Sequence, residues 1–189
     1  MLFFISLVIC IFLHELAHLV AAKYCKCKVE VFSIGFGPAI FKKKIGETIY
    51  QIALIPIGGY NKLKDEVSYS RSKHAFTNLP YRKKMIIILA GCAINIITGV
   101  IAALIGHILF NYNLIYFGIL SITLGISNLL PIPALDGSYP ILVWLEKLYG
   151  KKRGYAKMEK IVRVGFIIIM ALNIACIPYL IYLLRIHSL

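Results

Sequence analysis

The stretch MLFFISLVICIFLHELAHLVAA, residues 1 to 22, decides the fold, because it is long and apolar enough to cross a membrane yet carries three ionisable side chains. A membrane-spanning helix needs about 20 apolar residues. An ionisable group inside such a helix costs at least ~2.5 to 3.5 kcal/mol on insertion scales. His14, Glu15 and His18 can be polar residues of a bundle interior, but this cost favours a functional site.

The composition of the whole chain indicates a polytopic membrane protein. Of its 189 residues, 60% are hydrophobic and only 15% are charged, outside the range of ordinary soluble domains. Apolar runs at about 2–22, 85–110, 114–135 and 164–184 predict an all-α fold of about four transmembrane helices in a single domain, 1–189. A secretory signal peptide is disfavoured for the first run, because Lys23 and further lysines follow it instead of a cleavage site.

The chain has a net charge of +13, and the distribution of its basic residues indicates the membrane topology. Of the 21 basic residues, thirteen lie between Lys23 and Lys84 and seven between Lys147 and Arg163, whereas the short loop from Asn111 to Asn113 has none. By the positive-inside rule the two basic segments face the cytoplasm of a plasma-membrane protein, and both termini face outward. The bilayer is therefore the expected partner of these charges, and nucleic acid is not, because no aromatic and basic surface motif accompanies them.

The spacing of the two histidines in the first run is typical of a metal site. His14 and His18 lie four residues apart, so both imidazoles project from one helix face and can share a metal ion. Glu15 is rotated from that face but can reach a water bound to the metal. This H-E-x-x-H arrangement is that of zinc hydrolases, in which the glutamate takes a proton from the attacking water.

A third ligand is expected elsewhere in the chain, at the same membrane depth. Asp136, in SNLLPIPALDGSYP from Ser127 to Pro140, meets this requirement: it follows a span entered from outside, and His14 lies about 13 Å inside the cytoplasmic edge. Pro131 and Pro133 should break the helix before it, and Gly137 allows a turn. An N-cap of a cytoplasmic helix over 138–149 is the alternative role for Asp136.

The segment after the first span predicts a β-hairpin. Two β-prone runs, VFSIGFGPAIF at 31–41 and TIYQIALIPIGGY at 48–60, flank KKKIGE, which has the lysines and glycine of a basic turn.

With HELAH and NLLPIPALDG in one chain, the sequence resembles the site-2 proteases, the intramembrane zinc metalloproteases of peptidase family M50. FSIGFGPAIF, ALIPIGGYNKLKDE, AGCAIN and LGISNLLPIPALDG point to the branch of the bacterial regulator-of-sigma-E protease. Two features depart from it. Cys92 stands where the family usually has proline, and three polar residues stand where larger members carry a PDZ domain, so gating by that domain is not carried over.

The resemblance implies roles for particular residues. His14, His18 and Asp136 would bind one zinc ion per chain, and Glu15 would be the general base. Asn128 would hold the substrate backbone, although an interhelical bond is the alternative. The hairpin would re-enter the membrane beside the site, where its edge, including Gly58 and Gly59, would bind the substrate as an added strand or would only plug the cleft.

The resulting hypothesis is an intramembrane metalloprotease that hydrolyses peptide bonds within or next to transmembrane segments of other proteins or signal-peptide remnants. Two alternatives are a non-catalytic membrane zinc carrier or sensor and an inactive protease-like adaptor. Glu15 argues against a carrier, which has no need of a base that is not a ligand.

Overall fold

The computed structural model describes residues 2–65, 72–133, 135–139, 141, 144–146, 148–150, 153–154, 156–158, 160–165 and 167. The chain divides into two compact units, Met1–Leu130 and Pro131–Leu189, and each is described by itself. Most of the fourth apolar run, 164–184, lies outside the described residues.

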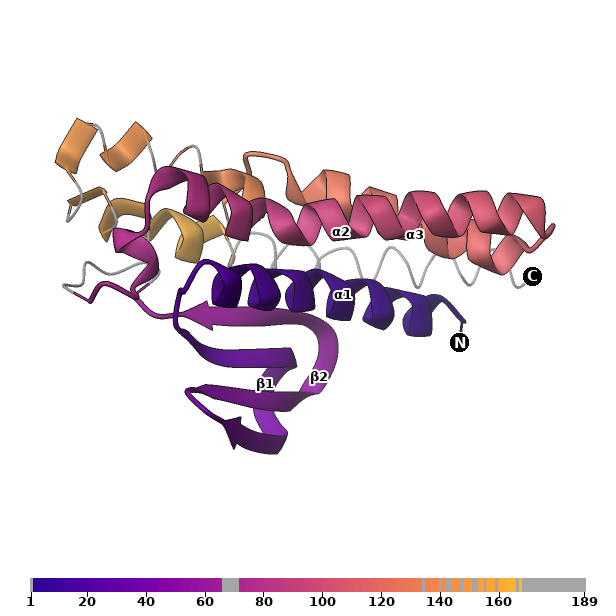
Figure 1. Cartoon of the computed structure of the whole chain (residues 1–189), viewed down its shortest axis with the longest axis horizontal. Helices are drawn as coiled ribbons and strands as arrows, with labels where there is room; N and C mark the ends of the chain where they lie inside the picture. The colour runs from indigo at the N-terminus through magenta and orange to yellow at the C-terminus, as the bar shows by residue number, and fades with distance from the viewer. Residues whose placement is uncertain are drawn as a thin grey trace. The chain divides into compact units, whose positions relative to one another are not determined.

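The first unit contains helices α1 (Leu2–Tyr24), α2 (Tyr81–Ile108) and α3 (Tyr112–Asn128) (Figure 1). Among the described residues, α1 and α2 are long and apolar enough to cross a membrane. Helix α2 begins four residues before the predicted span, directly after Pro80, whose φ of −62° suits the start of a helix.

Helix α3 ends at Asn128, seven residues before the predicted end of the third span. The predicted end was wrong because Pro131 lacks an amide hydrogen and disfavours helical backbone at the residue before it. The expectation that prolines break the helix before Asp136 is confirmed. At the other end of α3, Asn111 caps the helix by accepting hydrogen bonds from the backbone of Asn113 and Leu114 at 3.1 and 3.2 Å.

Helices α2 and α3 lie side by side, joined by a short turn (Figure 1). Their backbones approach so closely that a Cβ added at Gly118 would lie 2.6 Å from the carbonyl oxygen of Gly99. Small residues allow this packing, which apolar helices in a bilayer need in place of a hydrophobic driving force. A buried hydrogen bond of 2.8 Å from Ser121 Oγ to the Asn95 carbonyl joins the same pair.

The predicted hairpin is formed by β1 (Val29–Ile45) and β2 (Thr48–Leu63), which pair with each other. The turn is shorter than expected: it consists of Gly46 and Glu47, and the lysines 42–44 belong to the exposed end of β1. The strand continues through Lys42, Lys43 and Lys44 to Ile45, and of the two turn residues Gly46 takes the positive φ of 60° that a tight turn requires.

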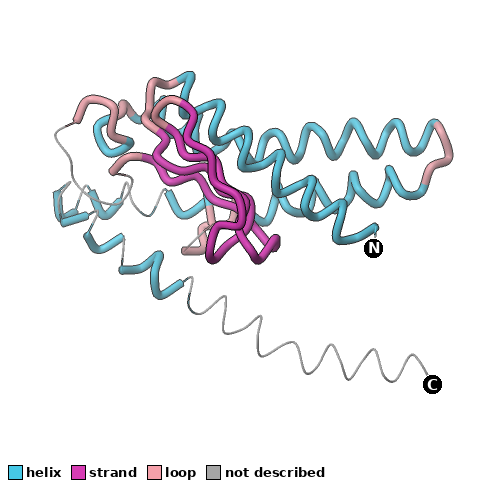
Figure 2. Tube along the Cα trace, turned by 90° about the horizontal axis from the view of Figure 1, so that it is seen from below, coloured by secondary structure: helices cyan, strands magenta, loops and turns pink. Residues whose placement is uncertain are grey.

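Both strands fold back on themselves, so their halves form a ladder of four segments, seen side by side in Figure 2. The outer half of β1 pairs with the first half of β2, from Ile45 beside Thr48 to Ala39 beside Ala53. The first half of β1 lies between the two halves of β2: Phe32 pairs with both Tyr50 and Asn61. Segment 59–63 is therefore one edge of the ladder and segment 39–45 is the other.

Glycines make this folding possible. Gly35 and Gly37 have φ values of +89° and +90°, which residues with a side chain rarely adopt. A Cβ at Gly35 would also lie 2.7 Å from the carbonyl oxygen of Ile55. The bend at these positions places the 59–63 edge next to α1, which packs against the sheet and against α2 (Figure 1).

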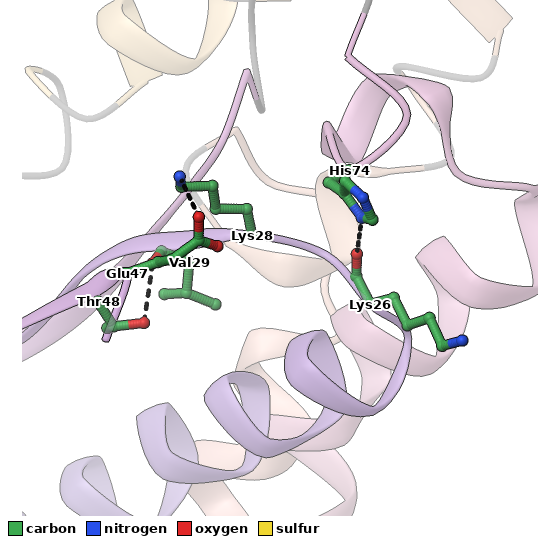
Figure 3. A network of polar contacts seen from close by, with 6 residues as sticks. All are labelled: Lys26, Lys28, Val29, Glu47, Thr48 and His74. Atoms are coloured by element: carbon green, nitrogen blue, oxygen red, sulfur yellow. Dashed lines mark hydrogen bonds and ion pairs between the residues drawn. The ribbon is translucent and has the colours of Figure 1, made fainter. Parts of the chain in front are cut away.

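Polar contacts join the start of β1 to the chain around it (Figure 3). Lys28 Nζ donates to Glu47 Oε1 at 2.9 Å, and Thr48 Oγ1 donates to the Val29 carbonyl at 3.0 Å. His74 Nδ1 lies 3.1 Å from the Lys26 carbonyl. The hydrogen bond and charge of Lys28 hold the pKa of Glu47 below its ordinary value, but this exposed pair contributes little to stability.

In the second unit, Asp136–Ser138 form a short 3-10 turn, η2, closed by a bond of 3.0 Å from the Ser138 amide to the Leu135 carbonyl. Leu135, and not Asp136, holds the capping position, and it makes no side-chain capping bond. The described residues of 139–150 are helical, in agreement with the helix predicted over 138–149.

Candidate metal centre

The two histidines of α1 converge as their spacing predicts. His14 and His18 are buried, with 7% and 8% of their surfaces exposed, and their Nε2 atoms lie 3.1 Å apart. Two nitrogens that bind one tetrahedral zinc ion at 2.0 to 2.1 Å lie about 3.3 Å apart. The pair therefore already has nearly the separation that a shared ion requires.

The orientation of His18 is fixed from α2. Its Nδ1 lies 2.7 Å from the carbonyl oxygen of Ile87, 69 residues away in the chain. A carbonyl oxygen only accepts, so Nδ1 must carry the hydrogen, and in the neutral ring Nε2 then presents its lone pair. This is the outer hydrogen bond that metal-binding histidines usually make, and it prepares Nε2 as a ligand.

Asn95 of α2 takes the corresponding position beside His14. The side chain of Asn95 is buried, and its Nδ2 lies 3.3 Å from His14 Nδ1. Its Oδ1 is buried without a hydrogen-bond partner among the described residues. The two ends of an amide have the same shape. With the amide turned, the oxygen would accept from His14 Nδ1 and leave His14 Nε2 as a ligand, as for His18.

Gly91 makes room for the pair. A Cβ at this position would meet His18 Nε2 and would lie 2.7 Å from His14 Cε1. Gly91 therefore lets α2 approach the histidine face of α1 closely. Two buried imidazoles, outer partners for both rings and a cradle that a methyl group would fill fit a zinc ion.

Glu15 lies against the edge of the sheet. Asn61 Nδ2 donates to both the backbone oxygen and the carboxylate Oε2 of Glu15, at 2.7 and 2.8 Å. A Cβ at Gly59 would lie 2.8 Å from Glu15 Cγ, so only glycine lets the strand approach this closely. The structure thus brings Gly59 to Glu15, while Gly58, with a φ of +114°, lies against the ring of Phe36.

The remaining predicted residues lie at ends of elements. Asn128 is the last residue of α3 and is half-buried. Asp136, in the second unit, is the first residue of η2 and is also half-buried.

Sequence reasoning missed Asn61 and underestimated Asn95. Asn61 follows the glycines of IPIGGY, but no spacing rule connects it with a glutamate 46 residues earlier. For Asn95 the sequence allows packing, which we favoured, or a bond across the interface or toward the cleft; in the structure its side chain lies beside His14. An amide inside an apolar run was the available signal for Asn95, because such a group needs a partner.

A helical fold with a buried H-E-x-x-H pair is typical of metal-dependent hydrolases. The model of peptidase family M50 matches residues 2–115 and 107–172, so the chain belongs to that family. Its fold is similar to that of the site-2 protease from Methanocaldococcus jannaschii, with a TM-score of 0.56 and 24% identity over 95% of this chain and 68% of that one.

Curated relatives match the chain over part of their length. A candidate zinc metalloprotease of Chlamydia pneumoniae is 39% identical over 111 residues, which are 52% of this chain and 18% of the relative. The regulator of sigma-E protease RseP of Escherichia coli is 42% identical over 106 residues, 53% of this chain and 23% of RseP. The matched region is thus less than a quarter of either relative.

Proposed function

We propose that this chain is an intramembrane zinc metalloprotease that hydrolyses peptide bonds within or next to transmembrane segments of membrane proteins or signal-peptide remnants. The observation that carries the proposal is the buried histidine pair on α1, with Nε2 atoms 3.1 Å apart, next to a glutamate held by the sheet edge. Membership of peptidase family M50 supports the same reaction class.

We assign the metal ligands to His14, His18 and Asp136. The four-residue spacing of the histidines and the NLLPIPALDG segment that contains Asp136 support this assignment. Two imidazoles and a carboxylate are a ligand set that catalytic zinc sites use, with the fourth position left for water. Bound zinc would lower the pKa of that water toward ~7 and polarise the peptide carbonyl.

Proton transfer and substrate binding would be performed by other residues of the chain. Glu15 accepts the proton of the attacking water and later passes it to the leaving amine. Asn128 presents an amide that can donate to and accept from the substrate backbone. The 59–63 edge, which begins at Gly59 directly after Gly58, pairs with β1 on one side, and an extended peptide would add to its other side as a strand.

A transmembrane substrate must unwind before it can be cleaved. In a helix each backbone amide is hydrogen-bonded within the segment, so its carbonyl is not available to water. Pairing with the 59–63 edge would replace the lost helical hydrogen bonds. Substrates with helix-destabilising residues near the cleavage site should therefore react fastest.

We further propose a multi-pass plasma-membrane location, with the catalytic cleft toward the cytoplasm and both termini outside. The support is the concentration of basic residues at 23–84 and 147–163. The hairpin would re-enter the membrane there, which agrees with the many apolar side chains exposed on it, among them Ile40, Phe41, Leu54 and Ile55.

The Glu15→Gln variant tests this function. Glutamine keeps the shape of the side chain but cannot accept a proton, so zinc should stay bound at about one ion per chain while cleavage falls at least about a hundredfold. Zinc content and activity are measured on one preparation in detergent, against a model transmembrane peptide with Gly or Asn near its centre.

The zinc content and the cleavage activity of these variants together distinguish a protease from a zinc carrier or an inactive adaptor. Zinc loss in His14→Ala or His18→Ala, but not in Glu15→Gln, is the expected pattern. A wild-type chain that binds zinc and cleaves nothing would favour a carrier or an adaptor. Cleavage at the wild-type rate by zinc-loaded Glu15→Gln would remove Glu15 from the reaction.

A further inference from the structure

Asn61 forms the contact between the sheet and Glu15. Its Nδ2 donates two hydrogen bonds, of 2.7 and 2.8 Å, to the backbone oxygen and the carboxylate of Glu15. Both partners are acceptors, so the nitrogen end of this amide must face α1. An amide that is hydrogen-bonded to both the backbone and the side chain of one residue restricts the rotation of that side chain.

The other end of the same amide is poorly placed for stability. Asn61 Oδ1 is buried and has no hydrogen-bond partner among the residues that the structure describes. A buried acceptor without a partner destabilises a fold, and an apolar side chain of the same shape would avoid the loss. The asparagine is thus better explained by what its nitrogen does for Glu15 than by stability.

The strand holds Asn61 and Gly59 on the same face. Residues two apart in a strand project to the same side, and both contact Glu15. Gly59 lets the strand approach, and Asn61 fixes the carboxylate at that distance. Segment 59–63 pairs with β1 through Asn61 beside Phe32, which holds the asparagine in register.

We propose that Asn61 is a positioning residue that holds the Glu15 carboxylate in one orientation, so that a peptide docked on the 59–63 edge meets an aligned base. The inference rests on the proposed protease function. Asn61 is neutral, so it adds no charge of its own beside the carboxylate.

The test compares Asn61→Leu, Asn61→Gln and Asn61→Asp with the wild type, using a model transmembrane peptide with Gly near its centre. Asn61→Leu should lower kcat about ten- to a hundredfold, the scale for losing alignment of a reacting group, with KM nearly unchanged. Zinc content should stay at the wild-type level. Asn61→Gln, which keeps a donor amide, should recover part of kcat, and Asn61→Asp, which repels Glu15, should recover none.

Two further measurements separate positioning from structure. The Tm of Asn61→Leu should not fall, because a buried acceptor without a partner is removed along with the bonds to Glu15. Asn78→Leu is the matched control: Asn78 Nδ2 donates to the Ser72 carbonyl, outside the site, and its loss should leave kcat unchanged.

A thermal double-mutant cycle tests the contact without any activity. The Tm changes of Asn61→Leu and Glu15→Ala should be non-additive in the double variant, as for residues in contact. Additive changes, or wild-type kcat in Asn61→Leu, would overturn the positioning role alone. A zinc-loaded wild type that cleaves nothing would overturn the proposed function, and this role with it.

Discussion

The imidazole rings of α1 are oriented by residues far away in the chain. The helix brings His14 and His18 to one face, but the contacts to their Nδ1 atoms come from elsewhere. Ile87 contacts Nδ1 of His18 from 69 residues away, and Asn95 contacts Nδ1 of His14 from 81 residues away. A ring whose Nδ1–H is engaged presents Nε2 to a metal without a competing tautomer. The affinity for zinc should therefore depend on residues that are not ligands.

Asn95→Leu tests this dependence. The substitution keeps a buried side chain of similar size but removes the partner of His14 Nδ1, so zinc affinity should fall about 10- to 100-fold, the usual cost of losing an outer partner. The measurement is a competition titration with a zinc chelator in detergent. Ser121→Ala is the control. Ser121 Oγ donates to the backbone oxygen of Asn95, so this variant removes a neighbouring hydrogen bond and leaves the Asn95 side chain in place. Equal affinities in both variants would contradict the role of Asn95.

Among the elements, the sheet has two edges of different character. Segment 59–63 lies beside Glu15, whereas segment 39–45 carries exposed lysines and pairs with 48–53. Exposed edges bind further strands unless something prevents it. Only an extended peptide on the first edge would lie next to the base.

Photo-crosslinking distinguishes the two edges. A benzophenone amino acid in place of Lys62, an exposed residue of the first edge, should crosslink to a model transmembrane peptide in a Glu15→Gln background that does not consume it. The same probe in place of the exposed Lys43 should crosslink much less. The yields are compared by gel and mass spectrometry. Stronger crosslinking at Lys43 would mean that the peptide binds at the opposite edge.

At the scale of the whole molecule, charge decides orientation in the membrane. The chain carries +13, and thirteen of its basic residues lie between Lys23, at the end of α1, and Lys84, at the start of α2. Lys84 at the start of α2 is buried, with its ammonium 5.7 Å from the ring centre of Phe76, so even a buried cation stays at this end of the helix. The loop between α2 and α3 has no basic residue.

Reporter fusions test the orientation. A fusion after Lys64 should report the cytoplasm, and one at Asn113 should report the outside, because Lys and Arg are retained on the cytoplasmic side. Alkaline phosphatase and a fluorescent protein, which are active on opposite sides, give complementary signals. An outward Lys64 would place the histidine pair at the other face of the membrane.

The sequence by itself determined the apolar helices, the hairpin and the spacing of His14, Glu15 and His18. These features follow from local rules: apolar length, strand alternation, the turn glycine and the four-residue period of a helix face. Proline chemistry likewise predicted that the helix breaks before Asp136, although the apolar run placed the end of the third span seven residues too late.

The tertiary structure decided which residues surround His14, Glu15 and His18. Ile87, Asn95 and Gly91 reach the histidines only because α2 packs against α1, and Asn61 reaches Glu15 only because both strands bend at glycines. A hydrogen bond between residues 46 to 81 positions apart leaves no periodic trace in a single sequence, because its geometry depends on helix packing and strand register. Local spacing therefore identified the chemical groups, and long-range packing fixed their orientation.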